Sequence, residues 1–119
     1  MPKPAKPTLD PWTFDALREQ APRTAELFKA SRYYSYHDSF DITKALYEYL
    51  DSRDFTIYVH SVAKSDRANA AIAGYEATIH IKHQPVPIER RIFPHFDDAR
   101  IHALGYVVDI FEEEQKITA

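Results

Sequence analysis

Basic and aromatic side chains recur between Tyr58 and Arg91, in a stretch whose alternation of apolar and polar residues is typical of β-strands. If these strands pair, one sheet face collects Tyr, His, Lys and Arg side chains with one or two carboxylates, which suits an anionic or polar partner. The competing interpretation is the ordinary solvated face of an antiparallel sheet. The candidate binding residues on this face are Tyr58, His60, His80, Lys82, Arg90 and Arg91.

The histidines predict neither a metal centre nor an assembled catalytic site. His80 and His83 point to opposite sides of a regular strand, and neither an HExxH pattern nor a carboxylate-rich cluster accompanies them. His60 with Glu76 or Asp66 could form a general base and its orienting carboxylate, but the sequence shows no oxyanion feature beside them. We therefore expect no metal, no cofactor and no catalytic residue; a small enzyme with a His-based acid/base site is the second alternative.

Composition excludes several other kinds of site. The chain has no cysteine, which excludes disulfides and thiolate nucleophiles, and its two glycines are too few for a Gly-rich phosphate loop. Its formal net charge of -3 has the wrong sign for a strongly basic nucleic-acid binder. The sequence carries neither the apolar stretch of a signal peptide nor a run approaching a membrane span, so we expect a cytoplasmic protein that does not contact a membrane.

A tyrosine cluster is the strongest recognition signal. Tyrosine offers a large contact area for little rotamer entropy and is enriched at interfaces. Tyr49 falls on the apolar stripe of the helix expected there and Tyr47 does not, so Tyr47 is the better surface candidate. Packing and partner binding both remain open for the cluster, whose candidate binding residues are Tyr33, Tyr34, Tyr36 and Tyr47.

Helical segments are predicted where apolar residues recur every three to four positions. Asp10 and Pro11 resemble an N-cap and a first helical residue, and Pro22 begins either a kinked continuation or a second helix. Residues 112–114 are three glutamates at the C-terminal end of the last helix, where the dipole disfavours them. They either fray into solvent, which we favour, or are retained for a basic partner. The segments are 10–20, 22–32, 41–51 and a final helix of roughly 15 to 18 residues led by Asp97 and Asp98.

The strands are predicted by alternation with period two. Residues 55–60 and 75–82 form the first two strands and residues 88–93 a third, with Pro85 and Pro87 at a turn or an edge. The linker 64–74 closes a hairpin or forms a short helix. The predicted fold class is α+β: two or three N-terminal helices, a three-stranded antiparallel sheet and a C-terminal helix, with the helices packed on one sheet face. Residues 1–9 are expected to be a flexible Pro/Lys arm and residues 10–119 a single domain.

The element order expected from Asp41 to Glu114 is similar in topology to that of double-stranded RNA-binding domains. Those domains carry lysines at the start of the last helix, whereas Asp97 and Asp98 stand here, and carboxylates repel a phosphate backbone. Nucleic-acid binding through the open sheet face and the basic arm is therefore the alternative interpretation. The leading one is a small non-enzymatic interaction module that regulates or inhibits another protein, with homodimerisation as one way to cover a free strand edge.

Overall fold

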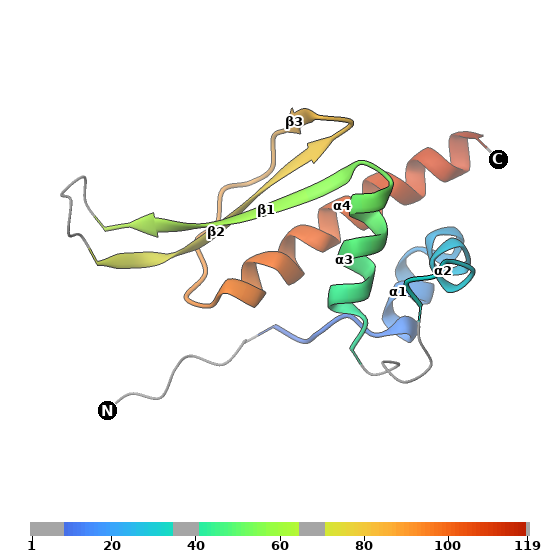
Figure 1. The fold of residues 1–119 in the computed structure, drawn as a ribbon, viewed down its shortest axis with the longest axis horizontal. Coiled ribbons are helices and arrows are strands. Elements are labelled where there is room, and N and C mark those ends of the chain that lie inside the picture. The colour runs from blue at the N-terminus through green and yellow to red at the C-terminus, as the bar shows by residue number, and fades with distance from the viewer. Residues whose placement is uncertain (1–8, 35–40, 65–70, 119) are drawn as a thin grey trace.

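The computed structural model describes residues 9–34, 41–64 and 71–118. Its elements are α1 (Phe14–Gln20), α2 (Pro22–Lys29), α3 (Thr43–Ser52), β1 (Phe55–Ala63), β2 (Ile72–Ile81), β3 (Gln84–Val86) and α4 (Phe96–Thr118). The three strands form one antiparallel sheet in the order β1-β2-β3, which confirms the predicted α+β class. Figure 1 shows α4 running along one side of the sheet and α1, α2 and α3 gathered near one end of the molecule.

The first helix begins later than the sequence predicts. Thr13, and not Asp10, is the N-cap, and its hydroxyl accepts a hydrogen bond from the first turn of α1 at 3.1 Å. The preceding backbone is bound to the start of α3, because the Trp12 N–H donates to the Thr43 hydroxyl at 2.9 Å. The Trp12 carbonyl accepts from the Ile42 N–H at 2.7 Å. These long-range bonds hold residues 10–12 outside the helix.

Pro22 begins a separate helix, α2, which confirms the second of the two alternatives for that segment. The N-cap residue of α2 is Ala21, which has no side-chain acceptor. Glu112 of α4 supplies one: its Oε1 accepts from the N–H and from the hydroxyl of Thr24, each at 2.8 Å. Glu112 is only 4% exposed, so the prediction that residues 112–114 fray into solvent is wrong for this carboxylate. It is a buried cap for a neighbouring helix.

The first two strands form a long hairpin in the predicted alternation. Phe55 lies opposite Ile81 and His60 opposite Glu76, and the pairing continues to Ala63 opposite Ile72. The Lys64 N–H donates to the Ala71 carbonyl at 2.8 Å, and the strand already includes residues 72 and 73, so the helical interpretation of the linker is wrong. The turn expected at residues 66–69 lies outside the described residues.

The third strand was predicted in the wrong place. It is formed by Gln84–Val86, while only the last residue of the predicted strand 88–93 touches the sheet, in an isolated bridge with Tyr75. The connecting turn uses Lys82 and His83 in the left-handed region, with φ of 52° and 67°, which is typical of a two-residue hairpin turn. Pro85 lies opposite His80, between the pairs at residues 84 and 86. Its missing N–H is tolerated because that position does not bond across the ladder.

The core lies between the sheet and the helices. The sheet contributes the buried side chains of Ile57 and Ile79. Helix α4 contributes a stripe of fully buried residues at helical spacing, at 103, 104, 107, 108 and 111. This helix packs against both long strands, so one face of the sheet is covered. Over the ranges 9–34, 41–64 and 71–118, no helix combines the length and apolarity that crossing a membrane requires.

Candidate functional site

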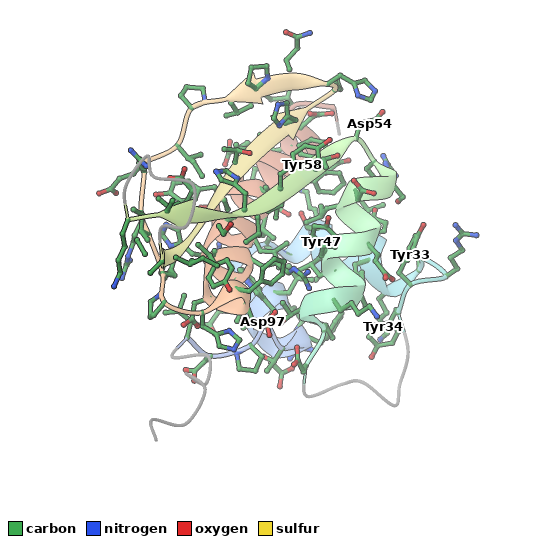
Figure 2. The ribbon with its side chains drawn as sticks, turned by 60° about the vertical axis from the view of Figure 1, so that its left-hand side comes forward. Tyr33, Tyr34, Tyr47, Asp54, Tyr58 and Asp97 are labelled. Atoms are coloured by element: carbon green, nitrogen blue, oxygen red, sulfur yellow. The ribbon has the colours of Figure 1, made fainter. Side chains whose placement is uncertain are left out.

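The sheet face turned away from α4 carries the candidate site. This outer face consists of the side chains of Tyr58, His60, Glu76, Thr78 and His80, which alternation places opposite the core residues. Tyr58 is 54% exposed, and its ring meets the His80 ring edge-on with centroids 5.0 Å apart. In Figure 2, Tyr58 and Tyr47 lie on opposite sides of β1. An exposed aromatic ring held in one orientation is well suited to contact a partner.

A charged network occupies one end of the outer face. Glu76 lies opposite His60 in the strand register, and its Oε1 is 3.0 Å from the His60 Nε2. Its other oxygen accepts from the Arg90 Nε at 2.7 Å. The hydrogen bond from Arg90, followed by that from His60, holds the pKa of Glu76 below its usual range. The structure therefore brings together the His60 and Glu76 pair that the sequence proposes, with Glu76 as a fixed anion between two donors.

An open cleft of about 560 Å³ adjoins the outer face, between β2 and residues 85–90. It arises because the chain leaves the sheet after Val86 and returns only at Phe93. Apolar side chains supply most of its walls, and Glu76 and Arg90 reach its rim. The apolar wall residues on the third-strand side are Pro85, Val86, Pro87 and Ile88.

The backbone of Ala77 faces this cleft with its hydrogen-bonding groups open. The Tyr75 N–H donates to the Phe93 carbonyl at 2.7 Å, and the Phe93 N–H donates to the Tyr75 carbonyl at 2.8 Å. Tyr75 therefore turns its backbone groups toward the third-strand side. Ala77, two residues along, turns its N–H and carbonyl the same way, before Ile79 pairs with Val86. Neither group has a hydrogen-bond partner on that side among the residues that the structure describes. The cleft therefore offers one donor and one acceptor beside apolar walls.

Two of the predicted basic residues do not lie on the outer face. Lys82 sits in the turn after β2, and its Nζ is 3.6 Å from Glu114 of α4, which covers the other side of the sheet. The Arg91 guanidinium lies over the Phe93 ring, 4.7 Å from its centroid. Arg90 is the residue that reaches the outer face, where it bonds to Glu76. The outer face therefore has one arginine, and the prediction of a row of cations on it is wrong.

The tyrosine cluster mainly completes the core. Tyr34 is half-buried, with its ring centroid 5.7 Å from that of Phe28, and Tyr33 packs 6.2 Å from Tyr49. Tyr47 was predicted to be a surface residue, but it is half-buried and its hydroxyl donates to the Ile57 carbonyl at 3.2 Å. Arg100 lies 4.9 Å from the Tyr47 ring centroid. Tyr36 lies outside the described residues.

The cleft walls are candidate site residues that sequence reasoning missed. The signal was the segment Pro85–Ile88, in which apolar residues alternate with prolines that cannot donate a ladder hydrogen bond. His80 also lines the cleft, and its Nδ1 is buried without a hydrogen-bond partner in the described part of the chain. Within that part, no group of three His, Asp or Glu side chains could hold a metal ion.

Comparison with known proteins identifies no relative. No protein-family model, no curated protein and no solved structure gives a significant match to this chain. What the chain does must therefore be inferred from the outer face, the cleft and the free backbone groups beside them.

Proposed function

We propose that this chain is a small, non-enzymatic protein-binding module that regulates or inhibits another protein by occupying part of its surface. The observation that carries the proposal is the juxtaposition of Tyr58, an exposed aromatic side chain held by His80, with an apolar cleft whose rim is charged. Aromatic residues beside desolvated pockets contribute much of the binding energy at protein interfaces. The charged rim would fix orientation more than affinity.

The chemistry of the cleft indicates what a partner would supply. An apolar side chain would fill the space beside Val86 and Ile88, and a neighbouring peptide group would pair with the N–H and carbonyl of Ala77. The interval between the pairs at Tyr75 and Ile79 leaves room for pairing with one residue, not with a long strand. The expected partner is therefore a protruding loop of a folded protein with an apolar residue at its tip.

The proposal is tested by quantitative capture from an extract of the native host. Tyr58→Ala removes the exposed ring, and Thr78→Arg places a long cation on the strand position opposite it. Ile117→Ala, which truncates an apolar side chain that is 82% exposed near the end of α4, is the matched control. A protein retained by the wild type and by the control, and lost from both outer-face variants, would support the proposal. Equal retention by all four proteins, or no retention by any, would contradict it.

Nucleic-acid binding stays a prediction and has its own readout. Lys82 and Arg90 each lie within 4 Å of a carboxylate, of Glu114 and Glu76 respectively, which reduces the positive charge they present. If they contact phosphates all the same, retention on a DNA or RNA column should fall steeply with salt. Replacing Lys82, Arg90 and Arg91 together by alanine should then abolish retention. A protein that passes through both columns at low salt would rule this alternative out.

A further inference from the structure

Strand β1 forms an edge of the sheet, and the direction of its backbone groups follows from the ladder. Because Tyr75 bonds to Phe93, the residues of β2 that bond to β1 are the even-numbered ones, and Thr78 lies opposite Tyr58. The odd-numbered residues of β1 therefore turn their N–H and carbonyl groups toward the free edge. The bond from the Tyr47 hydroxyl to the Ile57 carbonyl agrees with this alternation.

The free part of this edge is short and has defined ends. Tyr47 occupies the carbonyl of Ile57, so the open row begins at Val59 and continues through Ser61. The Lys64 N–H bonds to β2, so the alternation of β1 is unbroken there and Ala63 also faces outward. The register shift beside it arises because β2 has an additional residue, Ala73, between the partners of positions 62 and 63. In the described part of the chain, the outward groups of Val59 and Ser61 have no hydrogen-bond partner.

We propose that a second copy of this chain pairs with this edge in antiparallel orientation, with Ser61 on the two-fold axis. Val59 of one copy then lies opposite Ala63 of the other, and each of the three outward residues exchanges two N–H···O bonds with its counterpart. A register centred on residue 59 or 60 would pair Ile57, whose carbonyl is already bound to Tyr47. The register centred on Ser61 uses every open position and avoids that one.

The side chains of the edge favour self-association. Edge strands are commonly protected by lysine, proline or inward-pointing charges, but residues 59–63 contain none of these. In the proposed register Val62 faces His60 of the other copy, with no like charges opposite each other. Lys64 reaches the exposed ring of Tyr58, and a cation near that ring face is favourable. The two outer faces would form one continuous six-stranded surface, which doubles the site without covering it.

A single cysteine tests the register directly, because the chain has no cysteine of its own. In the proposed dimer the two residues 61 form a hydrogen-bonded pair, with Cα atoms about 5.5 Å apart and side chains on the same face. A short bifunctional thiol reagent should therefore cross-link Ser61→Cys to a covalent dimer. Thr78→Cys, an exposed position away from the edge, is the control and should not form a covalent dimer.

Light scattering on the purified protein supplies the second measurement. We expect a mass twice the 13.8 kDa of one chain for the wild type and for Ser61→Thr, which keeps the backbone N–H. Ser61→Pro removes that N–H from both copies while leaving the ladder to β2 intact, and should weaken the dimer roughly thirtyfold. A wild type of single-chain mass at millimolar concentration would overturn the proposal. So would a dimer in which Ser61→Cys fails to cross-link, because another surface would then hold it.

Discussion

The cap that Glu112 provides to α2 makes a quantitative prediction about stability. Its carboxylate accepts from the N–H and the hydroxyl of Thr24 at 2.8 Å and from the Arg23 N–H at 3.4 Å, at a site that is 4% exposed. Glu112→Ala leaves two buried donors of Thr24 without this acceptor, and each costs about 1–3 kcal/mol. Loss of the favourable charge at the helix N-terminus adds about 0.5 kcal/mol. We expect the free energy of unfolding to fall by about 4 kcal/mol.

A loss of this size is measurable by urea unfolding followed through the fluorescence of Trp12, the single tryptophan, which is 9% exposed. It would be a large part of the roughly 5–15 kcal/mol that stabilises a typical domain. Glu112→Gln keeps one acceptor oxygen and should lose about half as much. Glu113→Ala is the control, because its exposed carboxylate contacts only Lys116, at 3.3 Å, among the described residues, and should cost less than about 0.5 kcal/mol.

The reasoning can be refuted by a double-mutant cycle. Thr24→Val removes the hydroxyl donor at nearly constant volume and should cost about 1 kcal/mol in the wild type. In the Glu112→Ala background the same change should cost nothing or stabilise the protein, since the hydroxyl there is already unpaired. If Glu112→Ala is no more destabilising than Glu113→Ala, or if the two sites show no coupling, this carboxylate does not cap α2.

Three further predictions concern pH, packing and the strand edge. Burial alone would raise the pKa of Glu112, but the hydrogen bonds from Thr24 and the Arg23 N–H hold this pKa below its usual range. The stabilisation that the carboxylate provides is therefore present above the pKa of the unfolded state, and it is lost as the pH falls through the pKa of the folded state. The wild-type advantage over Glu112→Gln should therefore shrink below about pH 4, and an advantage that persists in stronger acid would contradict this. A Cβ at Gly74 would lie 2.5 Å from the Phe93 carbonyl oxygen, so Gly74→Ala should cost about 1–3 kcal/mol. At Gly105 an added Cβ would meet no atom within 4 Å apart from its chain neighbours and the backbone of its own helix, so Gly105→Ala should instead add about 1 kcal/mol. Equal melting temperatures for the two variants would show the packing argument to be wrong. Tyr47→Phe leaves the Ile57 carbonyl on the edge of β1 without its donor, so the free energy of unfolding should fall by about 1 kcal/mol. An unchanged melting temperature would show that this hydrogen bond does not stabilise the fold.

Periodicity was sufficient for the parts of the fold that have one buried face. The alternation from Phe55 to Val59 predicts which side chains of β1 face the core, and the spacing along α4 predicts its buried stripe. The His60 and Glu76 pair was also accessible from the sequence, because opposite positions on a hairpin share a face. These signals are local, and each is repeated over several residues.

The third strand shows where local signals fail. A two-residue hairpin turn with left-handed backbone usually contains glycine or asparagine, but here Lys82 and His83 adopt it. Pro85 appears unsuited to a strand until the register places it opposite His80, where no ladder bond is needed. The cleft exists because this strand is short and the following segment leaves the sheet, so predicting the strand at residues 88–93 concealed the cleft.

The elements and their inward faces are encoded in side-chain order, because apolar burial at a helix or strand period is a property of neighbouring residues. The contacts that give individual residues their roles are not encoded locally. Glu112 caps a helix 88 residues away in sequence. The Tyr47 hydroxyl bonds to the Ile57 carbonyl of the next strand, which lies beside it only because the chain reverses after α3. Residue type and spacing limit what each side chain can do, and which groups remain unpaired depends on which distant backbone atoms the packed chain brings beside them.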